Sequence, residues 1–256
     1  MNKQLLLLVG IILLSMNLML AQSTAGEGAT VEPTGLIDKP TAGMLGRGNY
    51  AVSGSFFQRG GVLFGVSVGL LNQFSFGISY GGTDLLGSSK PEMNPYPGVN
   101  VKVRVVEETT TFPAIAIGFD SQGREVYLDS LKRYGIKSPG FYAVASQNYA
   151  MMGNLSLHGG VNYCLEREDG DKDINFFFGA EKSLGKQFSL LLEYDLATND
   201  NSADVLGRGR GYLNFGLRWS WGKGMVVGFD LKDVAKNRQN ISVGNRTLYF
   251  EFIGSF

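Results

Sequence analysis

The chain alternates apolar and polar residues with a period of two along many segments, which is the pattern of a β-strand with two different faces. In one such segment, Leu213 and Phe215 flank Asn214. Twelve segments show the pattern: 48–58, 61–70, 73–81, 98–107, 112–120, 141–149, 154–164, 174–182, 187–197, 210–221, 224–233 and 245–255. The sequence therefore predicts an all-β fold, in which the apolar faces form either the core of a soluble sandwich or the lipid-facing surface of a membrane barrel.

The lengths of the connections distinguish these two folds. From the third strand onward, the odd-numbered connections are long and polar, whereas the even-numbered ones are tight turns such as Gly222-Lys223. The long connections are 82–97, 121–140, 165–173, 198–209 and 234–244. A sandwich gives no reason for such sorting, but an outer-membrane barrel has short periplasmic turns and long extracellular loops. We therefore predict a single antiparallel transmembrane β-barrel of about 12 strands.

Both ends of the chain agree with a barrel in the outer membrane of a diderm bacterium. Residues 1–21 combine Lys3, a short apolar run and a small residue at Ala21, which predicts a cleaved signal peptide. The last segment alternates up to the aromatic Phe256, the usual end of the signal that the barrel-insertion machinery reads, although Gly254 stands where Tyr is more common. The predicted division is a signal peptide (1–21), an N-terminal periplasmic segment (22–47) and the barrel (48–256).

Composition excludes several classes of function. The 23 basic and 23 acidic residues balance, so nothing indicates nucleic acid as a partner. Cys164 is the only cysteine, which excludes an internal disulfide and a multi-cysteine metal site. Asp169, Asp171 and Asp173 have the spacing of the first three EF-hand ligands, but the required glycine and glutamate are absent, so a solvated loop is expected. We predict no cofactor and no metal site.

The polar parity of the strands predicts which charged side chains face the lumen. These are Lys102, Arg104, Arg218 and Lys232, with Glu181, Glu193, Asp195, Asp230 and Glu251. Four positive charges against five negative ones favour ion pairs and a filled or narrow interior over a strongly selective pore. Glu193 and Arg218 are predicted to pair across adjacent strands. Trp219, Trp221 and Phe256 are predicted to form part of the inner aromatic girdle, where indole rings meet lipid headgroups.

Enzymatic motifs are weak in this chain. Two G-x-S-x-G strings, at 65–69 and 77–81, lie inside predicted strands, whereas a nucleophile elbow requires a strand-to-helix turn. His158, the only histidine, shares the lumenal parity, so we interpret it as a hydrogen-bonded lumen residue. Barrel enzymes that use a Ser–His pair in lipid chemistry carry it at the lipid-facing rim.

Several stretches resemble the YjbH-like outer-membrane proteins linked to exopolysaccharide biosynthesis. They are 40–50, 79–82, 94–98, 113–120, 136–142, 153–163 and 173–181. The resemblance implies a small outer-membrane barrel and brings no catalytic residues.

Three functions are open at this point. The first is a non-enzymatic narrow channel, or an accessory factor in envelope polysaccharide or lipid transport, with envelope-export components as partners. The second is a barrel enzyme acting on lipid A or phospholipid. The third is a structural or adhesive barrel that works through its extracellular loops. In each case the outer surface is expected to contact outer-membrane lipids and lipopolysaccharide.

Overall fold

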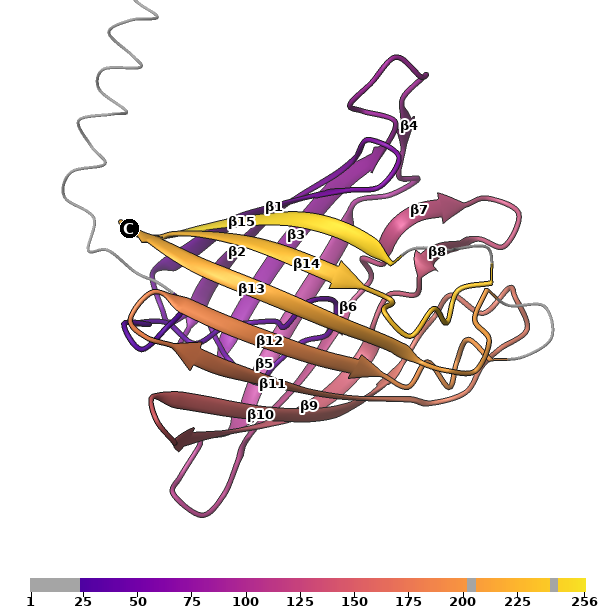
Figure 1. The fold of residues 1–256 in the computed structure, drawn as a ribbon. Coiled ribbons are helices and arrows are strands. Elements are labelled where there is room, and N and C mark those ends of the chain that lie inside the picture. The colour runs from indigo at the N-terminus through magenta and orange to yellow at the C-terminus, as the bar shows by residue number, and fades with distance from the viewer. Residues whose placement is uncertain (1–23, 202–205, 240–243) are drawn as a thin grey trace, which may run out of the picture.

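The computed structural model describes residues 24–201, 206–239 and 244–256, and the predicted signal peptide lies outside these residues. The main sheet is a ring of long antiparallel strands (Figure 1). Its strands are β1 (Asn49–Phe57), β2 (Gly61–Leu71), β3 (Phe74–Thr83), β5 (Gly98–Val106), β6 (Ala114–Asp120), β9 (Gly140–Ala150), β10 (Asn154–Tyr163), β11 (Asn175–Leu184), β12 (Phe188–Asp195), β13 (Tyr212–Gly222), β14 (Met225–Lys232) and β15 (Asn245–Ser255). Each of the twelve predicted strands is confirmed, with ends that shift by a few residues.

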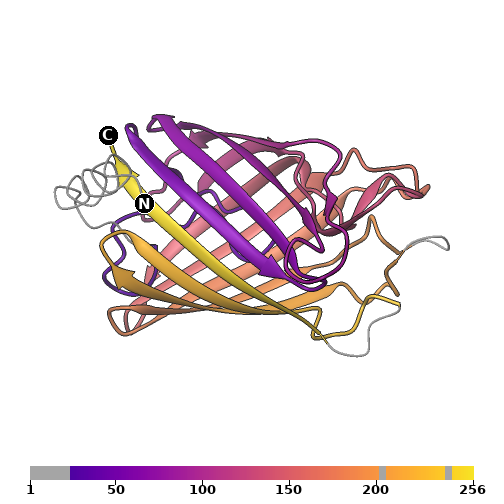
Figure 2. The same ribbon diagram turned by 90° about the horizontal axis from the view of Figure 1, so that it is seen from above.

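The ring closes between the first and the last of these strands. β1 pairs antiparallel with β15, so that Asn49 lies opposite Ser255 and Phe56 lies opposite Leu248. β1 also pairs with β2, and β2 with β3, which leaves no free edge in the ring. Figure 2 shows the tilted strands of the closed barrel from a second direction. The predicted antiparallel barrel of about 12 strands is therefore confirmed, and closure satisfies the backbone hydrogen bonds that an open edge would leave unpaired.

The two faces of the barrel wall have opposite polarity. On β2 and β12 the apolar side chains point outward: Phe64 is 50% exposed, Val66 45% and Leu190 46%. On the inward face, Asn175 and Glu193 are fully buried. A soluble sandwich would bury the apolar set instead, so the sandwich alternative is wrong for this chain.

The two ends of the barrel differ in their connections. The turn end, where β1 starts and β15 ends, has the short links 72–73, 107–113, 151–153, 185–187 and 223–224. The loop end has the connections 58–60, 84–97, 121–139, 164–174, 196–211 and 233–244. Three short strands lie within the loop-end connections: β4 (Glu92–Met93), β7 (Arg124–Leu128) and β8 (Arg133–Ile136). Among the described residues, no helix is long and apolar enough to cross a membrane.

The stretch before β1 runs inside the barrel, where Figure 1 draws it in indigo. We call residues 24–47 the inner segment. A periplasmic segment was predicted over residues 22–47, and its described part instead contacts the inward face of the barrel wall. The inner segment contributes Ala42 to one apolar cluster with Ala116 and Phe177 of the wall. It contributes Leu45 to another cluster, with Ala51 and Ile253.

Candidate functional site

The centre of the lumen holds a tight reversal of the inner segment. Gly35 and Pro40 form an isolated antiparallel bridge, and the Leu36 N–H donates to the Lys39 carbonyl at 2.9 Å. Pro40 fixes its own backbone angle, which favours a turn at this position. The tip of the reversal, residues 36–39, therefore projects toward the wall formed by β11 to β14.

Glu193 of β12 binds that tip. Its Oε2 atom accepts the backbone N–H groups of Ile37, Asp38 and Lys39 at 3.0, 2.9 and 2.9 Å. Its Oε1 atom accepts the Asn214 side-chain amide at 2.9 Å. A buried carboxylate is costly unless its oxygens are fully hydrogen-bonded, and this one is satisfied by three backbone donors and one side-chain donor.

The side chains of the tip form ion pairs with the wall. Lys39 Nζ lies 2.8 Å from an Asp195 carboxylate oxygen. Lys232 Nζ lies 2.5 Å from Asp38 Oδ1, and Arg124 Nε lies 3.6 Å from the same atom. Because Arg124 belongs to β7, Asp38 connects the inner segment to a loop-end element as well as to the barrel wall.

Two basic residues of β5 hold the rest of the inner segment. Lys102 Nζ donates to the carbonyls of Thr34, Thr41 and Gly43 at 2.6, 3.0 and 3.2 Å. Arg104 donates to the Ala42 carbonyl at 3.1 Å and pairs with Glu32. Lys102 and Arg104 therefore bind groups of the inner segment.

A glycine of the wall makes room for the segment. Gly179 of β11 faces inward, and a Cβ atom at this position would overlap the side chain of Leu36. Glycine at this position thus leaves the space that the Leu36 side chain fills against β11.

The predicted pairing of Glu193 with Arg218 is wrong. In the register of β12 and β13, Glu193 lies opposite Asn214, and Ser189 lies opposite Arg218. Arg218 instead binds Asp230 of β14 through both terminal nitrogens, at 2.5 and 3.3 Å, and its guanidinium lies over the Tyr249 ring at 4.7 Å. The actual partner of Glu193 is the inner segment, which has no periodicity from which its position in the lumen could be predicted.

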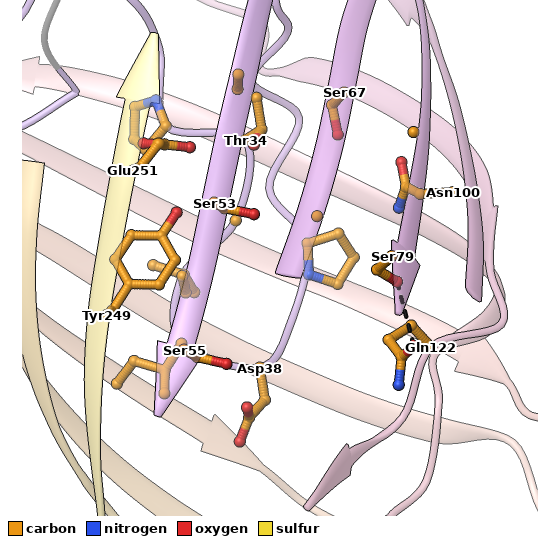
Figure 3. Close-up of a pocket in the computed structure, with 18 of the residues that line it drawn as sticks. Thr34, Asp38, Ser53, Ser55, Ser67, Ser79, Asn100, Gln122, Tyr249 and Glu251 are labelled. Carbon is orange, nitrogen blue, oxygen red and sulfur yellow. Dashed lines mark hydrogen bonds between the residues drawn. The ribbon is translucent and has the colours of Figure 1, made fainter. Parts of the chain in front are cut away.

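A polar cavity of about 220 Å³ remains between the inner segment and the opposite wall. Figure 3 shows Ser53 and Ser55 on β1 and Ser67 on β2 beside this space, with Tyr249 and Glu251 on the neighbouring β15. Asn100 and Gln122 add amide groups to the lining. The wall here carries hydroxyls and small residues because serine and glycine alternate with outward apolar residues on these strands.

A second cavity, of about 300 Å³, is lined by the first part of the inner segment and by wall residues such as Asn154 and Ser183. Thr24, Pro33 and Glu181 line both cavities. Glu181 therefore lies where the two spaces adjoin.

The structure places all nine predicted lumen charges on the inward face. Seven of them have the partners given above: Lys102, Arg104, Glu193, Asp195, Arg218, Asp230 and Lys232. Of these, Asp195 and Lys232 bind side chains at the tip of the inner segment. Glu181 and Glu251 are 8% exposed and take part in none of the ion pairs of the described residues.

His158 is buried in the lumen, as its parity predicted, and its Nδ1 atom lies 2.7 Å from Ser146 Oγ. Ser146 Oγ also accepts the Ala42 N–H at 2.9 Å. The Nε2 atom has no hydrogen-bond partner among the described residues. The pair thus lies beneath the inner segment, and no carboxylate of the described residues orients the imidazole ring.

The predicted solvated loop at 169–173 is wrong for its first two aspartates. Asp169 and Asp171 are buried, and Asp169 binds Arg133 at 2.6 Å and Lys137 at 2.8 Å. Arg133 also binds Asp200 at 2.7 Å. Burial alone would lower the pKa of Arg133, but hydrogen bonds and charges from Asp200 and Asp169 outweigh it and raise the pKa. This cluster joins three of the loop-end connections, and the described residues contain no group suited to hold a metal ion.

The predicted girdle residues lie on the outer surface at the turn end. Trp219 stacks on Trp221 at 5.4 Å and on Phe188 at 6.0 Å, and Trp221 is 64% exposed. Phe256 is 89% exposed and lies against Tyr50, with ring centroids 5.1 Å apart.

Two solved structures of the KdgM porin have a fold similar to that of this chain. A structure titled "KdgM porin" has a TM-score of 0.52 at 12% identity and covers 81% of this chain and 99% of its own. A second, titled "KdgM porin in complex with disordered oligogalacturonate", gives the same values. No curated protein matches the chain. The YjbH family model, described as exopolysaccharide biosynthesis protein YbjH, matches residues 30–130, so the resemblance to that family is confirmed over this part of the chain.

Proposed function

We propose that the protein is a non-enzymatic outer-membrane channel, narrowed by its own inner segment, that passes small hydroxyl-rich solutes such as sugars. The cavity of about 220 Å³ between the inner segment and the serine-lined wall carries this proposal. Ser53, Ser55 and Ser67 direct hydroxyls toward it, and such groups can exchange hydrogen bonds with a sugar as they do with water.

The width of the barrel supports a restricted passage. Eight-stranded barrels are filled by side chains, and barrels of sixteen or more strands leave an aqueous channel. A twelve-stranded ring lies between these limits, and here the inner segment takes part of the lumen. The remaining cavities suit one small solute at a time better than a long polymer.

The outer surface supports placement in the outer membrane. Apolar side chains such as Phe64 and Leu190 would contact outer-membrane lipids, and lipopolysaccharide would lie around the loop end. The C-terminal strand would be read by the barrel-insertion machinery. The family name and the complex of a KdgM porin with oligogalacturonate support a carbohydrate role, and envelope-export components are proposed partners.

The enzyme alternative has less support. A Ser–His hydrolase needs an exposed serine and a group that orients the histidine. Ser146 is buried beneath the inner segment, and His158 Nε2 lacks a partner among the described residues.

Conductance in planar bilayers tests the channel. The wild-type barrel should conduct, and Ser67→Phe should lower the conductance because the ring would enter the cavity. Val66→Phe is the matched control, since Val66 is the outward neighbour on the same strand. Folded protein that never conducts would contradict the channel. Equal conductance in both variants would contradict a path through this cavity.

A further inference from the structure

We propose that Glu181 and Glu251 make the lumen select for cations, so that the solutes are neutral or cationic sugars, including amino sugars, rather than polyanions. This inference rests on the proposed channel function. It deepens that function because it assigns the charge of the solute to two named carboxylates.

Glu181 occupies the position that a solute would have to pass. It projects inward from β11 and lines both the cavity of about 220 Å³ and the cavity of about 300 Å³. Its Oε2 atom is buried without a hydrogen-bond partner among the described residues. A buried unpaired carboxylate oxygen is costly, and a cation or a donor group that enters the lumen would relieve that cost.

Glu251 approaches the same space from β15. Its Oε2 atom accepts the Thr24 hydroxyl at 3.2 Å, and no described cation lies within ion-pair distance. Figure 3 shows its carboxylate beside the cavity, above Tyr249. Hydrogen bonds from hydroxyls leave its negative charge uncompensated.

None of the described cations around the cavity pairs with Glu181 or Glu251. Lys39 pairs with Asp195, Lys232 and Arg124 pair with Asp38, and Arg218 pairs with Asp230. Lys102 has no carboxylate partner, but its ammonium donates to three carbonyls of the inner segment rather than to either glutamate. Arg218 is the one described cation that acts electrostatically on both Glu181 and Glu251, and its guanidinium is already paired with Asp230. When the two glutamates are ionised, the local balance is negative.

A negative stretch in a confined lumen sets ionic selectivity. Charged side chains that line a pore attract ions of opposite sign and repel ions of the same sign, and the low dielectric of the wall strengthens this effect. A uronate-containing oligomer would meet Glu181 at the junction of the cavities and be repelled. The similarity to the KdgM porin concerns the fold alone. The carboxylates of this lumen favour neutral or cationic solutes over an anionic oligogalacturonate.

The test measures charge selectivity in the full-length protein. In bilayers with a KCl gradient, the reversal potential should show that K⁺ passes more readily than Cl⁻. Glu181→Gln with Glu251→Gln should bring the permeability ratio toward unity. Glu168→Gln, an exposed loop carboxylate outside the lumen, is the matched control and should keep the wild-type ratio. Heat-modifiability in detergent checks that each variant is folded.

Liposome swelling gives a second measurement on the wild type alone. Glucosamine and glucose should enter faster than glucuronate, which is of similar size and carries a negative charge. Equal or faster entry of glucuronate, or a preference for Cl⁻, would overturn the selectivity while leaving the channel in place. Absence of conductance and of all swelling would contradict the channel function itself.

Discussion

Glu193 and Asp38 lie 155 positions apart in the chain, and the Glu193 carboxylate accepts the Asp38 backbone N–H at 2.9 Å. The bond joins the middle of the barrel wall to the tip of the inner segment. The same carboxylate also accepts the backbone N–H groups of Ile37 and Lys39. The Glu193 side chain therefore anchors the segment that narrows the lumen.

Arg218 and Asp230 should show strong energetic coupling. Arg218→Gln or Asp230→Asn alone leaves a buried charge without its partner, and each should destabilise the barrel by about 3–5 kcal/mol. The double variant should lose much less than the sum of the two, because neither charge is left unpaired. The midpoint of the heat-modifiability transition in detergent measures the effect.

The control cycle combines Asp230→Asn with Arg246→Gln. Arg246 is an exposed cation on β15 and should give additive effects with Asp230. Additivity in the Arg218 cycle as well would show that the 2.5 Å contact contributes nothing specific.

Arg133 should hold the loop end together. The residue is fully buried, and Arg133→Met would leave Asp169 and Asp200 without a shared cation, at a local cost of about 3–5 kcal/mol. Limited proteolysis should then cut the 121–139 and 196–211 connections faster, while the barrel stays folded. Lys172→Ala removes an exposed cation from the same end of the barrel. This control variant should be cleaved at the wild-type rate. Wild-type cleavage of Arg133→Met would contradict the role of the cluster.

Cys164 should be unreactive in the folded protein. Burial first, and then the charge of Glu166, raise its pKa from an ordinary 9.0 to about 11. Because the thiolate is the reactive form, at about pH 8 its fraction should be about a hundredfold smaller than in the unfolded chain. The rate of reaction with N-ethylmaleimide, compared in native and denatured protein, measures this. Equal rates would show that the loop around Cys164 opens readily.

The barrel could be predicted from the sequence because strand alternation and loop lengths are local signals. The polar parity placed residues such as Lys102 and Glu251 on the inward face, since side chains of a strand alternate strictly between its two sides. Few folds other than a barrel are compatible with twelve segments that alternate in this way and have connections of these lengths.

The occupied lumen could not be predicted in the same way. Residues 24–47 have neither the period of a strand nor that of a helix, so their position depends on contacts with residues far along the chain, such as Ser146 and Glu193. The partner of Arg218 was missed for a related reason. Parity gives the face of a side chain, whereas the register that places Arg218 opposite Gly228 and close to Asp230 depends on the whole ring.

The most direct test of a lumen narrowed by its inner segment is the single-channel conductance of Glu193→Ala. This change removes the acceptor of three backbone N–H groups and should release the tip of the segment. Gly179→Val should act in the same direction, because its side chain would take the space of Leu36. Leu192→Ala, the outward neighbour of Glu193, is the matched control.

We expect both inward variants to conduct more than the wild type and to admit larger sugars in liposome swelling, with Leu192→Ala unchanged. Wild-type conductance in folded Glu193→Ala and Gly179→Val would contradict the inner segment as the element that sets the width of the lumen.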